Sequence, residues 1–336
     1  MFVGIIYTYI INVLISKTEE NMENLKKWGA LTIVDIESAT HVTHSGVFHC
    51  DEVLATIFFL LAGENMRLAR VSAIPDNIDP HVVMYDIGGG RYDHHQKGGN
   101  GKRKVRHCVP YASAGLVWRD TYKKILAAFS CPLSLVQEAY YELDRRLVEG
   151  VDGVDNGVKA TVGGEFNYSI ISLSSIVSSF NLAWDESGNS DNAFVDAVNI
   201  VLPIVVRLIT SAISAVKSIS VVDAAIDESK DNIVVLPAPG MPWQRRIFSK
   251  KSEKAQNALF VVYPTSRGGY GVQAIPPCLG SFGQKCPFPQ EWRGASIEVL
   301  KQLTGLKDVQ FCHSTGFFAA AESIDSAIKL AKLAQK

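Results

Sequence analysis

Four short stretches in the first half of the chain combine residue types that bind metal ions. In "HVTHSGVFHCDEV", His44, His49 and Asp51 follow the spacing H-x4-H-x-D at an expected strand-to-helix junction. Imidazole and carboxylate groups together suit Mn²⁺, Zn²⁺ or Fe²⁺, but not Ca²⁺ or Cu(I). Taken alone, the stretch also fits a helix N-terminus, where the carboxylates of Asp51 and Glu52 would be favourable caps.

The next two stretches lie close together in the chain. Asp86 ends the apolar run "VVMYD", where a carboxylate serves no packing purpose. Asp93, His94 and His95 follow a few residues later, between two glycine-rich runs in "IGGGRYDHHQKGGNGKR". Separately, these residues are typical of a turn and of an exposed loop. Their proximity favours a shared site.

The fourth stretch, "VEGVDGVDNG", places Asp152 and Asp155 in an expected glycine-punctuated loop after a helix. The four stretches together supply enough ligands for two metal ions roughly 3.5–4 Å apart, with a shared carboxylate and a shared water. Such a pair points to hydrolysis of a phosphate ester or anhydride. No G-x-S-x-G elbow, phosphate-binding P-loop or dinucleotide fingerprint competes with this interpretation.

The elements that must position these ligands alternate between strands and helices. "LTIV" and "HVVMYDIGG" predict strands, whereas "DEVLATIFFLLAG", "YASAGLVWRDTYKKILAAF" and "LSLVQEAYYELDRRLVEG" have helical periodicity. This alternation predicts an α/β domain with a mainly parallel sheet. In such sheets ligands bind at the carboxyl ends of the strands, where the candidate residues fall.

The length of 336 residues favours two domains. We expect a metal-binding catalytic domain over 31–185 and a helical connection over 186–230, kinked or broken near Pro203. A smaller α+β domain over 231–336 follows. Residues 1–30 form an extension whose apolar start "MFVGIIYTYIINVLIS" is a membrane anchor, a buried element or an artefact upstream of a start at Met22.

Composition limits the classes of partner. Hydrophobic residues make up 47% and charged residues 20% of an ordinary globular chain, and the formal net charge is −1. A polyanion would therefore need a local basic patch or metal ions, which leaves short strands, nucleotides and small phosphates open. Six scattered cysteines without a C-x-x-C pair favour an intracellular location. We expect no stable membrane association, and a homo-oligomer stays open.

The order of the motifs resembles the DHH phosphoesterase superfamily. More closely, it is similar to the metal-dependent protein hydrolase family, the melanocyte-proliferating-gene exonucleases. The stretches that carry this resemblance run from residue 43 to 317: "THSGVFHCDEVLA", "YDIGGGRYDHHQKG", "YASAGLVW", "VDGVDNG", "GVQAIP", "FPQEWRG" and "HSTGF". As an ordered series they are highly specific, although single members such as "GVQAIP" are not.

The resemblance implies a DHH-type domain, a C-terminal substrate-binding domain and a divalent-metal site with two ions, most readily Mn²⁺, with Mg²⁺, Zn²⁺ or Fe²⁺ as alternatives. The implied metal ligands are His44, His49, Asp51, Asp86, His94 and one of Asp152 and Asp155. Asp86 would bridge the ions. Asp93 would orient a histidine. The catalytic set would be Asp86, His94 and His95.

The implied activity is 3′-to-5′ exonucleolytic cleavage of RNA, in the nucleus, mitochondrion or cytoplasm. His95, Arg293, His313 and Ser314 would contact the substrate, with Arg267 and Lys285 as further candidates in the second domain. Lys97, Lys102, Arg103 and Lys104 would form a basic flap. Relative to the wider superfamily, His49 replaces a carboxylate, which raises the charge of the site by one.

Two alternatives stay open. The low net charge and the lack of an aromatic-rich basic stripe favour a small substrate such as pyrophosphate, a nucleotide or a dinucleotide. A non-enzymatic scaffold is the other, but the ligand set is too large for one closed structural ion.

Overall fold

The computed structural model describes residues 28–104, 108–158 and 171–336. The expected N-terminal extension therefore falls almost entirely outside the described residues. The chain divides into two compact units, one ending at Ile213 and the other beginning at Ser214. This division falls inside the segment that the sequence predicts as a helical connection.

The N-terminal unit is built on a four-stranded sheet whose strand order is β1-β3-β2-β4. The strands are β1 (Leu31–Ile33), β2 (His41–His44), β3 (Met66–Val71) and β4 (Val83–Met84). All three pairings are parallel, which confirms the predicted parallel sheet. The predicted strand over 81–89 is largely wrong, because only two of its residues join the sheet. Here the chain pairs briefly and then turns away at Asp86.

Parallel pairing brings two segments that carry candidate ligands to one edge of the sheet. His44 is the last residue of β2, and Asp86 follows two residues after the end of β4. Because Val42 pairs with Met84, the carboxyl ends of β2 and β4 lie side by side. Asp86 N–H then donates to the carbonyl of Tyr92, which ties the strand end to the following loop.

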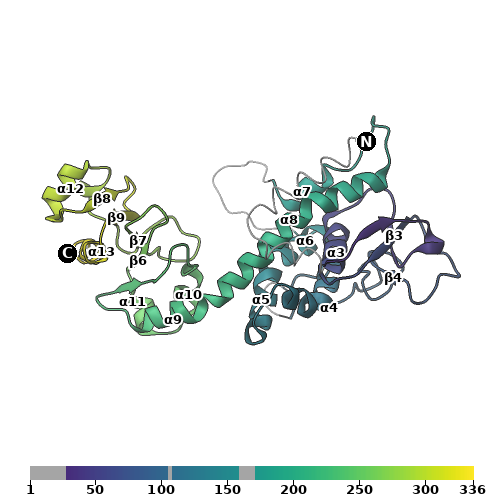
Figure 1. Cartoon of the computed structure of the whole chain (residues 1–336), viewed down its shortest axis with the longest axis horizontal. Helices are drawn as coiled ribbons and strands as arrows, with labels where there is room; N and C mark the ends of the chain where they lie inside the picture. The colour runs from purple at the N-terminus through teal and green to yellow at the C-terminus, as the bar shows by residue number, and fades with distance from the viewer. Residues whose placement is uncertain (1–27, 105–107, 159–170) are drawn as a thin grey trace. The chain divides into compact units, whose positions relative to one another are not determined.

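Helices pack beside this sheet (Figure 1), and two of them carry the candidate ligands Asp51 and Asp155. They are α3 (Cys50–Leu61), α4 (Ser113–Ala128), α5 (Val136–Leu143) and α6 (Glu149–Asp155), with a π-helical turn at Asp144–Val148 and 3₁₀ turns at Ile36–Ser38 and Leu133–Leu135. Every residue of α3 is buried. Asp152 and Asp155 lie on α6, so the prediction that they lie in a loop is wrong. The glycines there interrupt neither helical hydrogen bonding nor packing.

The unit continues through α7 (Leu173–Ser178) into α8 (Ser190–Lys217). Helix α8 runs past Pro203, so the helix is not broken there. Within the described residues, one helical stretch, Ser190–Asp227, is long and apolar enough to cross a membrane by length and composition alone, and 33% of its most apolar window is buried. Core helices of soluble proteins meet the same criterion, so the observation is weak evidence for a membrane span.

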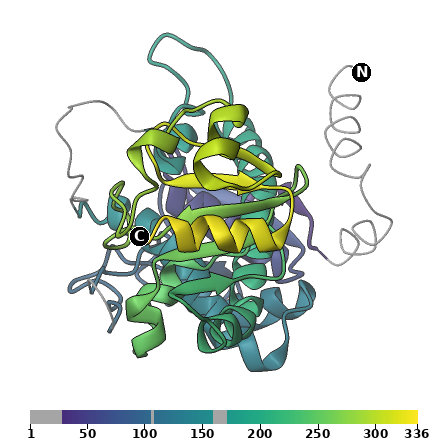
Figure 2. The same cartoon turned by 90° about the vertical axis from the view of Figure 1, so that its left-hand side faces the viewer.

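The C-terminal unit contains a mixed five-stranded sheet with the order β5-β6-β7-β9-β8. The strands are β5 (Ile233–Val235), β6 (Phe260–Pro264), β7 (Tyr270–Ala274), β8 (Val309–Cys312) and β9 (Phe318–Ala321). The helices are α9 (Ile219–Asp227), α10 (Gln244–Ser249), α11 (Glu253–Asn257), α12 (Ile297–Thr304) and α13 (Ile324–Leu333), with a 3₁₀ turn at Gln290–Trp292. Figure 2 shows α13 lying across the sheet.

Both faces of this sheet are covered, as the alternation of its strands requires. Phe260 and Val262 pack into the cluster that contains Leu330 of α13. Val261, between them, packs into a second cluster with Trp243 beside α10. The fold is thus α/β with a parallel sheet in the first unit and α+β in the second, which confirms the predicted fold class.

Candidate metal centre

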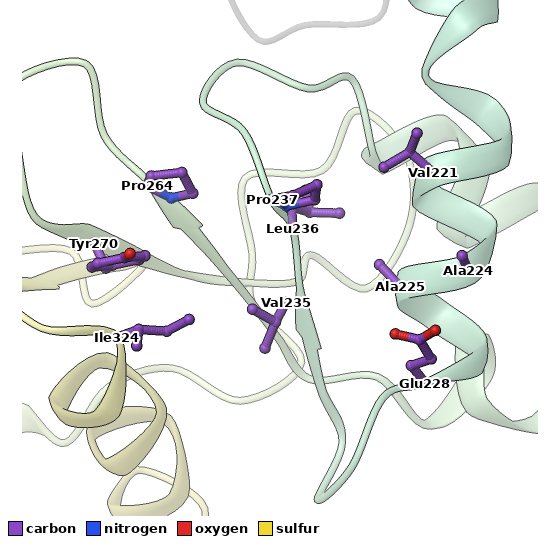
Figure 3. Close-up of a pocket in the computed structure, with 10 residues that line it drawn as sticks. All are labelled: Val221, Ala224, Ala225, Glu228, Val235, Leu236, Pro237, Pro264, Tyr270 and Ile324. Carbon is purple, nitrogen blue, oxygen red and sulfur yellow. The ribbon is translucent and has the colours of Figure 1, made fainter.

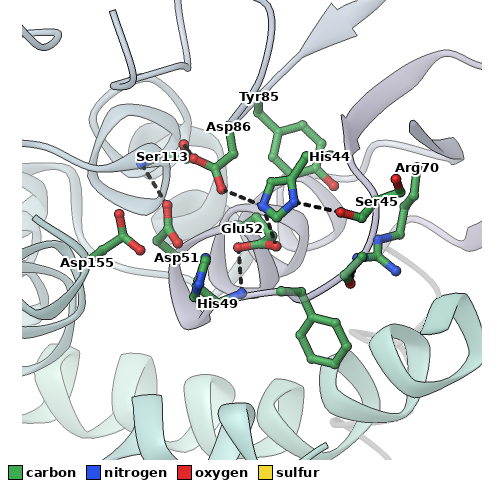
Figure 4. A network of polar contacts seen from close by, with 12 residues as sticks. His44, Ser45, His49, Asp51, Glu52, Arg70, Tyr85, Asp86, Ser113 and Asp155 are labelled. Atoms are coloured by element: carbon green, nitrogen blue, oxygen red, sulfur yellow. Dashed lines mark hydrogen bonds and ion pairs between the residues drawn. The ribbon is translucent and has the colours of Figure 1, made fainter. Parts of the chain in front are cut away.

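His44 lies at the centre of the site, between two carboxylates. Its Nε2 is 2.9 Å from Glu52 Oε1 and 3.2 Å from Asp86 Oδ2 (Figure 4). Its Nδ1 lies 3.2 Å from the Ser45 carbonyl, which can only accept, so Nδ1 carries a proton. Contacts with Asp86 and then with Glu52 raise the pKa of His44 to about 10.

Asp51 and Asp155 form a second group beside the first. Ligand atoms of His49, Asp51 and Asp155 lie within 4.8 Å of one another, and so do those of His44, His49 and Glu52. Asp51 comes from the first turn of α3 and Asp155 from the last residue of α6. His49 therefore lies next to both groups, from the position that immediately precedes α3.

His94 contacts the second group through Asp155. Its Nε2 lies 2.7 Å from Asp155 Oδ2, and its Nδ1 lies 3.3 Å from Asp86 Oδ1. Burial acts against the charged imidazole, but the contacts with Asp155 and Asp86 raise the pKa of His94 to about 10. Of the two aspartates left open by the sequence, Asp155 is the one that this histidine contacts.

Asp86 connects the two groups through its two oxygens, since Oδ2 faces His44 and Oδ1 faces His94. Its backbone is left-handed, with φ 58°, a conformation that costs free energy for a residue other than glycine. The turn that aims this carboxylate at both histidines is thus maintained by the surrounding structure. Although burial favours the neutral acid, contacts with His44 and His94 hold the pKa of Asp86 well below its ordinary value.

The N-terminus of α4 faces the same carboxylates. Ser113 Oγ donates to Asp86 Oδ1 at 2.9 Å, and Ser113 N–H donates to Asp51 Oδ2 at 3.3 Å. The positive end of the helix dipole adds to these contacts. Sequence reasoning missed Ser113, although the stretch "YASAGLVW" that contains it is part of the resemblance.

The chemistry of the donor set fits divalent metal ions. Asp51 and Glu52 are 0% exposed, and carboxylates are almost never buried so deeply without a counterion. Burial raises the pKa of both. Four buried atoms of this site lack a hydrogen bond of good geometry to any described residue: Asp51 Oδ1, Glu52 Oε1, Asp86 Oδ2 and His94 Nδ1. Nitrogen and oxygen atoms that converge on one another in this way are what a metal position requires.

Asp93 and His95 lie beside Asp86, whose Oδ1 is 3.4 Å from Nδ1 of His95. Asp93 is buried and accepts hydrogen bonds from Gly89 N–H at 2.7 Å and His95 N–H at 2.9 Å. The same carboxylate lies 3.0 Å from Nδ1 of His95. The His95 side chain is 58% exposed. The Asp93 carboxylate thus contacts both the backbone N–H and the ring Nδ1 of His95.

Arg103 is not part of an exposed flap, because it is buried in a different cluster. Its guanidinium makes two bonds to Asp144, of 2.9 and 2.6 Å, and lies 2.9 Å from Asp152 Oδ2. The other oxygen of Asp152 accepts from Gly115 N–H at 3.0 Å. A side chain at Gly115 would collide with Asp152, with a Cβ 1.9 Å from Oδ2. The remaining flap residues are exposed: Lys97, Lys102 and Lys104.

In the C-terminal unit, the predicted substrate residues lie near one another. Arg293 packs over Gly316, where a Cβ would lie 2.6 Å from its Nε, and Ser314 lies beside Gly294. His313 Nδ1 accepts from Thr315 N–H at 3.2 Å. Lys285 is different, because its ammonium donates to the carbonyls of Gln256 and Ala258.

The same unit contains a cavity of about 330 Å³ (Figure 3). Of the ten lining residues drawn there, Glu228 alone carries a charge, and the walls include Leu236, Pro264 and Tyr270. An apolar cavity with one carboxylate does not suit a phosphate.

Glu52 is the second residue that sequence reasoning missed as a site component. The sequence offers Asp51 and Glu52 as helix caps, and Glu52 indeed caps α3 by accepting from His49 N–H at 2.9 Å. The available signal was its position beside Asp51 in the first turn of an otherwise apolar helix.

Comparison with known proteins agrees with this assembly of residues. The profile of MYG1_exonuc, described as "Uncharacterised protein family (UPF0160)", matches residues 40–335. MYG1 exonuclease of Rattus norvegicus is 31% identical over 324 residues, covering 88% of this chain and 84% of the relative. The MYG1 protein of Schizosaccharomyces pombe is 28% identical, covering 87% of this chain and 96% of the relative.

Among solved structures, RecJ of Thermus thermophilus in complex with Mg²⁺ is 12% identical and covers 89% of this chain and 50% of its own. Its TM-score of 0.22 is too low to bear on the fold. The family profile and the rat relative carry the identification, and they confirm the predicted family and that it is a family of enzymes. The chain belongs to the MYG1 exonuclease family.

Proposed function

We propose that the protein is a metal-dependent phosphodiesterase that shortens RNA or short single strands from the 3′ end. The observation that carries this proposal is the convergence of two histidines and three further carboxylates around Asp86, whose two oxygens face different histidines. Relatives named exonucleases support the choice of a nucleic-acid substrate.

The residues that would hold two ions are His44, His49, Asp51, Asp86, His94 and Asp155, with Asp86 shared. When bound, a pair of divalent ions supplies Lewis acidity toward a phosphoryl oxygen and a nucleophilic water at neutral pH. Mn²⁺ fits this mixed set of imidazole and carboxylate donors, and Mg²⁺, Zn²⁺ and Fe²⁺ are alternatives. Asp152 is not included, because Arg103 occupies its carboxylate.

The side chains of the site have separate tasks in this proposal. Asp93 contacts Nδ1 of His95, so the protonated ring of His95 could donate from Nε2 to the phosphate oxygen or the leaving oxygen and return to the neutral form. Ser113 and the N-terminus of α4 hold Asp86 and Asp51 in position through hydrogen bonds. Arg293, His313 and Ser314 would contact the substrate from the C-terminal unit.

A 5′-labelled RNA oligonucleotide incubated with purified protein and Mn²⁺ tests the proposal. A 3′-to-5′ exonuclease produces a ladder of labelled products that shorten with time, whereas the opposite polarity releases a labelled mononucleotide at once. Omission of metal, or the Asp86→Asn variant, should leave the strand intact. An intact strand with the wild-type protein under every divalent metal would reject the nuclease.

A small phosphate compound is the second candidate substrate. The net charge of −1 favours it, and so do the internal contacts that occupy Arg103 and Lys285. Values of kcat/KM for pyrophosphate, dinucleotides and longer strands separate the two candidates. A steep preference for long strands excludes the small substrate.

A further inference from the structure

Glu52 has more contacts than a helix cap requires. One oxygen, Oε2, accepts from His49 N–H, which completes the cap. The other oxygen, Oε1, points away from this cap and lies 2.9 Å from His44 Nε2. A capping glutamate ordinarily lies in the exposed first turn of its helix, whereas Glu52 is 0% exposed.

Three acceptor atoms converge where Oε1 points. His44 donates from Nδ1 to the Ser45 carbonyl, so in the neutral ring Nε2 presents a lone pair. That lone pair faces Glu52 Oε1 at 2.9 Å and Asp86 Oδ2 at 3.2 Å. Neither oxygen has a hydrogen bond of good geometry among the described residues. In the metal-free protein a proton on Nε2 can satisfy both oxygens, and a metal ion that binds here takes the place of that proton.

We propose that Glu52 is itself a metal ligand, and that it makes the two metal positions chemically unequal. This inference rests on the metal-dependent function proposed above. Glu52, His44 and His49 form one position, and Asp51, His94 and Asp155 form the other, with Asp86 between them. The first position then has two imidazoles, and the second has one and more carboxylates.

The charges of the site agree with this division. Asp51, Glu52, Asp86 and Asp155 supply four negative charges, which balance two divalent ions. Without Glu52 the loaded site would keep one uncompensated positive charge in a buried environment, which is costly. The position with two imidazoles should favour borderline ions such as Zn²⁺ or Fe²⁺, and the carboxylate-rich position should favour Mn²⁺ or Mg²⁺.

The test is a metal count on the full chain after chelation and equilibrium dialysis against Mn²⁺. Glu52→Gln removes the charge but keeps an oxygen that can accept from His49 N–H, so the cap survives. We expect two ions in the wild type, and in the variant one tightly bound ion with the other weakened about 10–100-fold or more. Spin coupling between two Mn²⁺ ions, seen by electron paramagnetic resonance, should disappear at concentrations that saturate only the tight position.

Glu64→Gln is the matched control, because Glu64 pairs with His41 at 3.1 Å outside the cluster. It should bind two ions as the wild type does. Asp51→Asn should also retain one ion, and the double variant with Glu52→Gln should retain none. If circular dichroism shows that Glu52→Gln is unfolded, Glu52→Asp replaces it, since the shortened side chain withdraws the ligand and should weaken one ion.

Two ions of unchanged affinity in the folded Glu52 variant would overturn the inference and leave the proposed function intact. A wild-type protein that binds no divalent ion would overturn both.

Discussion

Two clusters of carboxylates lie in the interior of the N-terminal unit, and their negative charges are compensated in different ways. In the first, Arg103 lies between Asp144 and Asp152, so the chain supplies its own cation. In the second, Asp51, Glu52, Asp86 and Asp155 converge with histidines. Within the described part of the chain, no lysine or arginine forms an ion pair with any of these four.

On the function proposed above, this difference separates a structural cluster from a functional one more clearly than residue type does. Breaking a buried ion pair leaves an uncompensated charge and is strongly destabilising. In the second cluster the compensating charges are protons on His44 and His94, and on the function proposed above these protons are exchanged for metal ions. Substitutions in the first cluster should therefore affect stability, and substitutions in the second should affect catalysis.

The largest expected effect follows from Asp86→Asn, in the second cluster. Loss of the shared carboxylate should lower kcat by at least about 10³-fold, since metal ions contribute several kcal/mol to the transition state. Asparagine tolerates the left-handed backbone, so circular dichroism should show a folded protein. Asp76→Asn, at an exposed position, serves as the control with wild-type activity. Wild-type turnover by Asp86→Asn would remove the site assignment.

Arg103→Met should have the largest effect on stability. Asp144 and Asp152 would then be buried without their cation, which should lower the free energy of unfolding by about 3–5 kcal/mol. Urea denaturation of the metal-free protein measures this loss. Adding Asp144→Asn and Asp152→Asn should recover much of it, because the uncompensated charges are gone. If Arg103→Met is as stable as the wild type, Arg103 does not compensate the charge of the first cluster, and the two clusters do not differ in the way argued above.

Asp93→Asn tests whether Asp93 acts through His95. A misoriented imidazole should lower kcat about 10–100-fold, as loss of an orienting carboxylate typically does. His95→Asn should lower kcat by at least about 10²-fold. The double variant should be no slower than His95→Asn alone if the two residues act as one unit. Additive losses would show that Asp93 has a separate role.

The pH dependence of the metal-free protein tests the same contrast between the clusters. Burial raises the pKa of Asp152 to about 7 from an unfolded value of 3.8, despite the charge of Arg103. The neutral Asp152 carboxyl favours the folded state. This contribution to the free energy of unfolding is complete below about pH 4 and is lost as the pH rises through about 7. For His44 and His94, raised from 6.5 to about 10, the contribution is complete below about pH 6.5 and lost through about pH 10.

Denaturation at a series of pH values should thus separate the two clusters. Asp152→Asn should flatten the profile between about pH 4 and 7, and His44→Asn should flatten it between about pH 6.5 and 10. Added Mn²⁺ should change only the second window. A metal effect confined to the first window would reverse the assignment of the clusters.

Much of the fold was predictable because its elements have strong local patterns. The helices over 50–61 and 113–128 follow their predicted periodicities. The strand β3 and the shortness of β4 were not predicted, because pairing with neighbouring strands decides how much of an apolar run joins a sheet. Likewise, glycines at 150 and 153 indicated a loop, but packing keeps this segment helical as α6.

The sequence by itself determined the family, the order of the ligand-bearing stretches and the kind of chemistry, because donor types and their positions at strand ends are local properties. Tertiary structure alone decided which side chains meet. Asp152 and Asp155 are three residues apart, yet one contacts Arg103 and the other His94. From the sequence, Glu52 is a helix cap. In the folded protein it shares the imidazole of His44 with Asp86, which lies 34 positions later in the sequence. Contacts across such distances in the chain leave no local pattern, so only the folded arrangement distinguishes a structural carboxylate from a metal ligand.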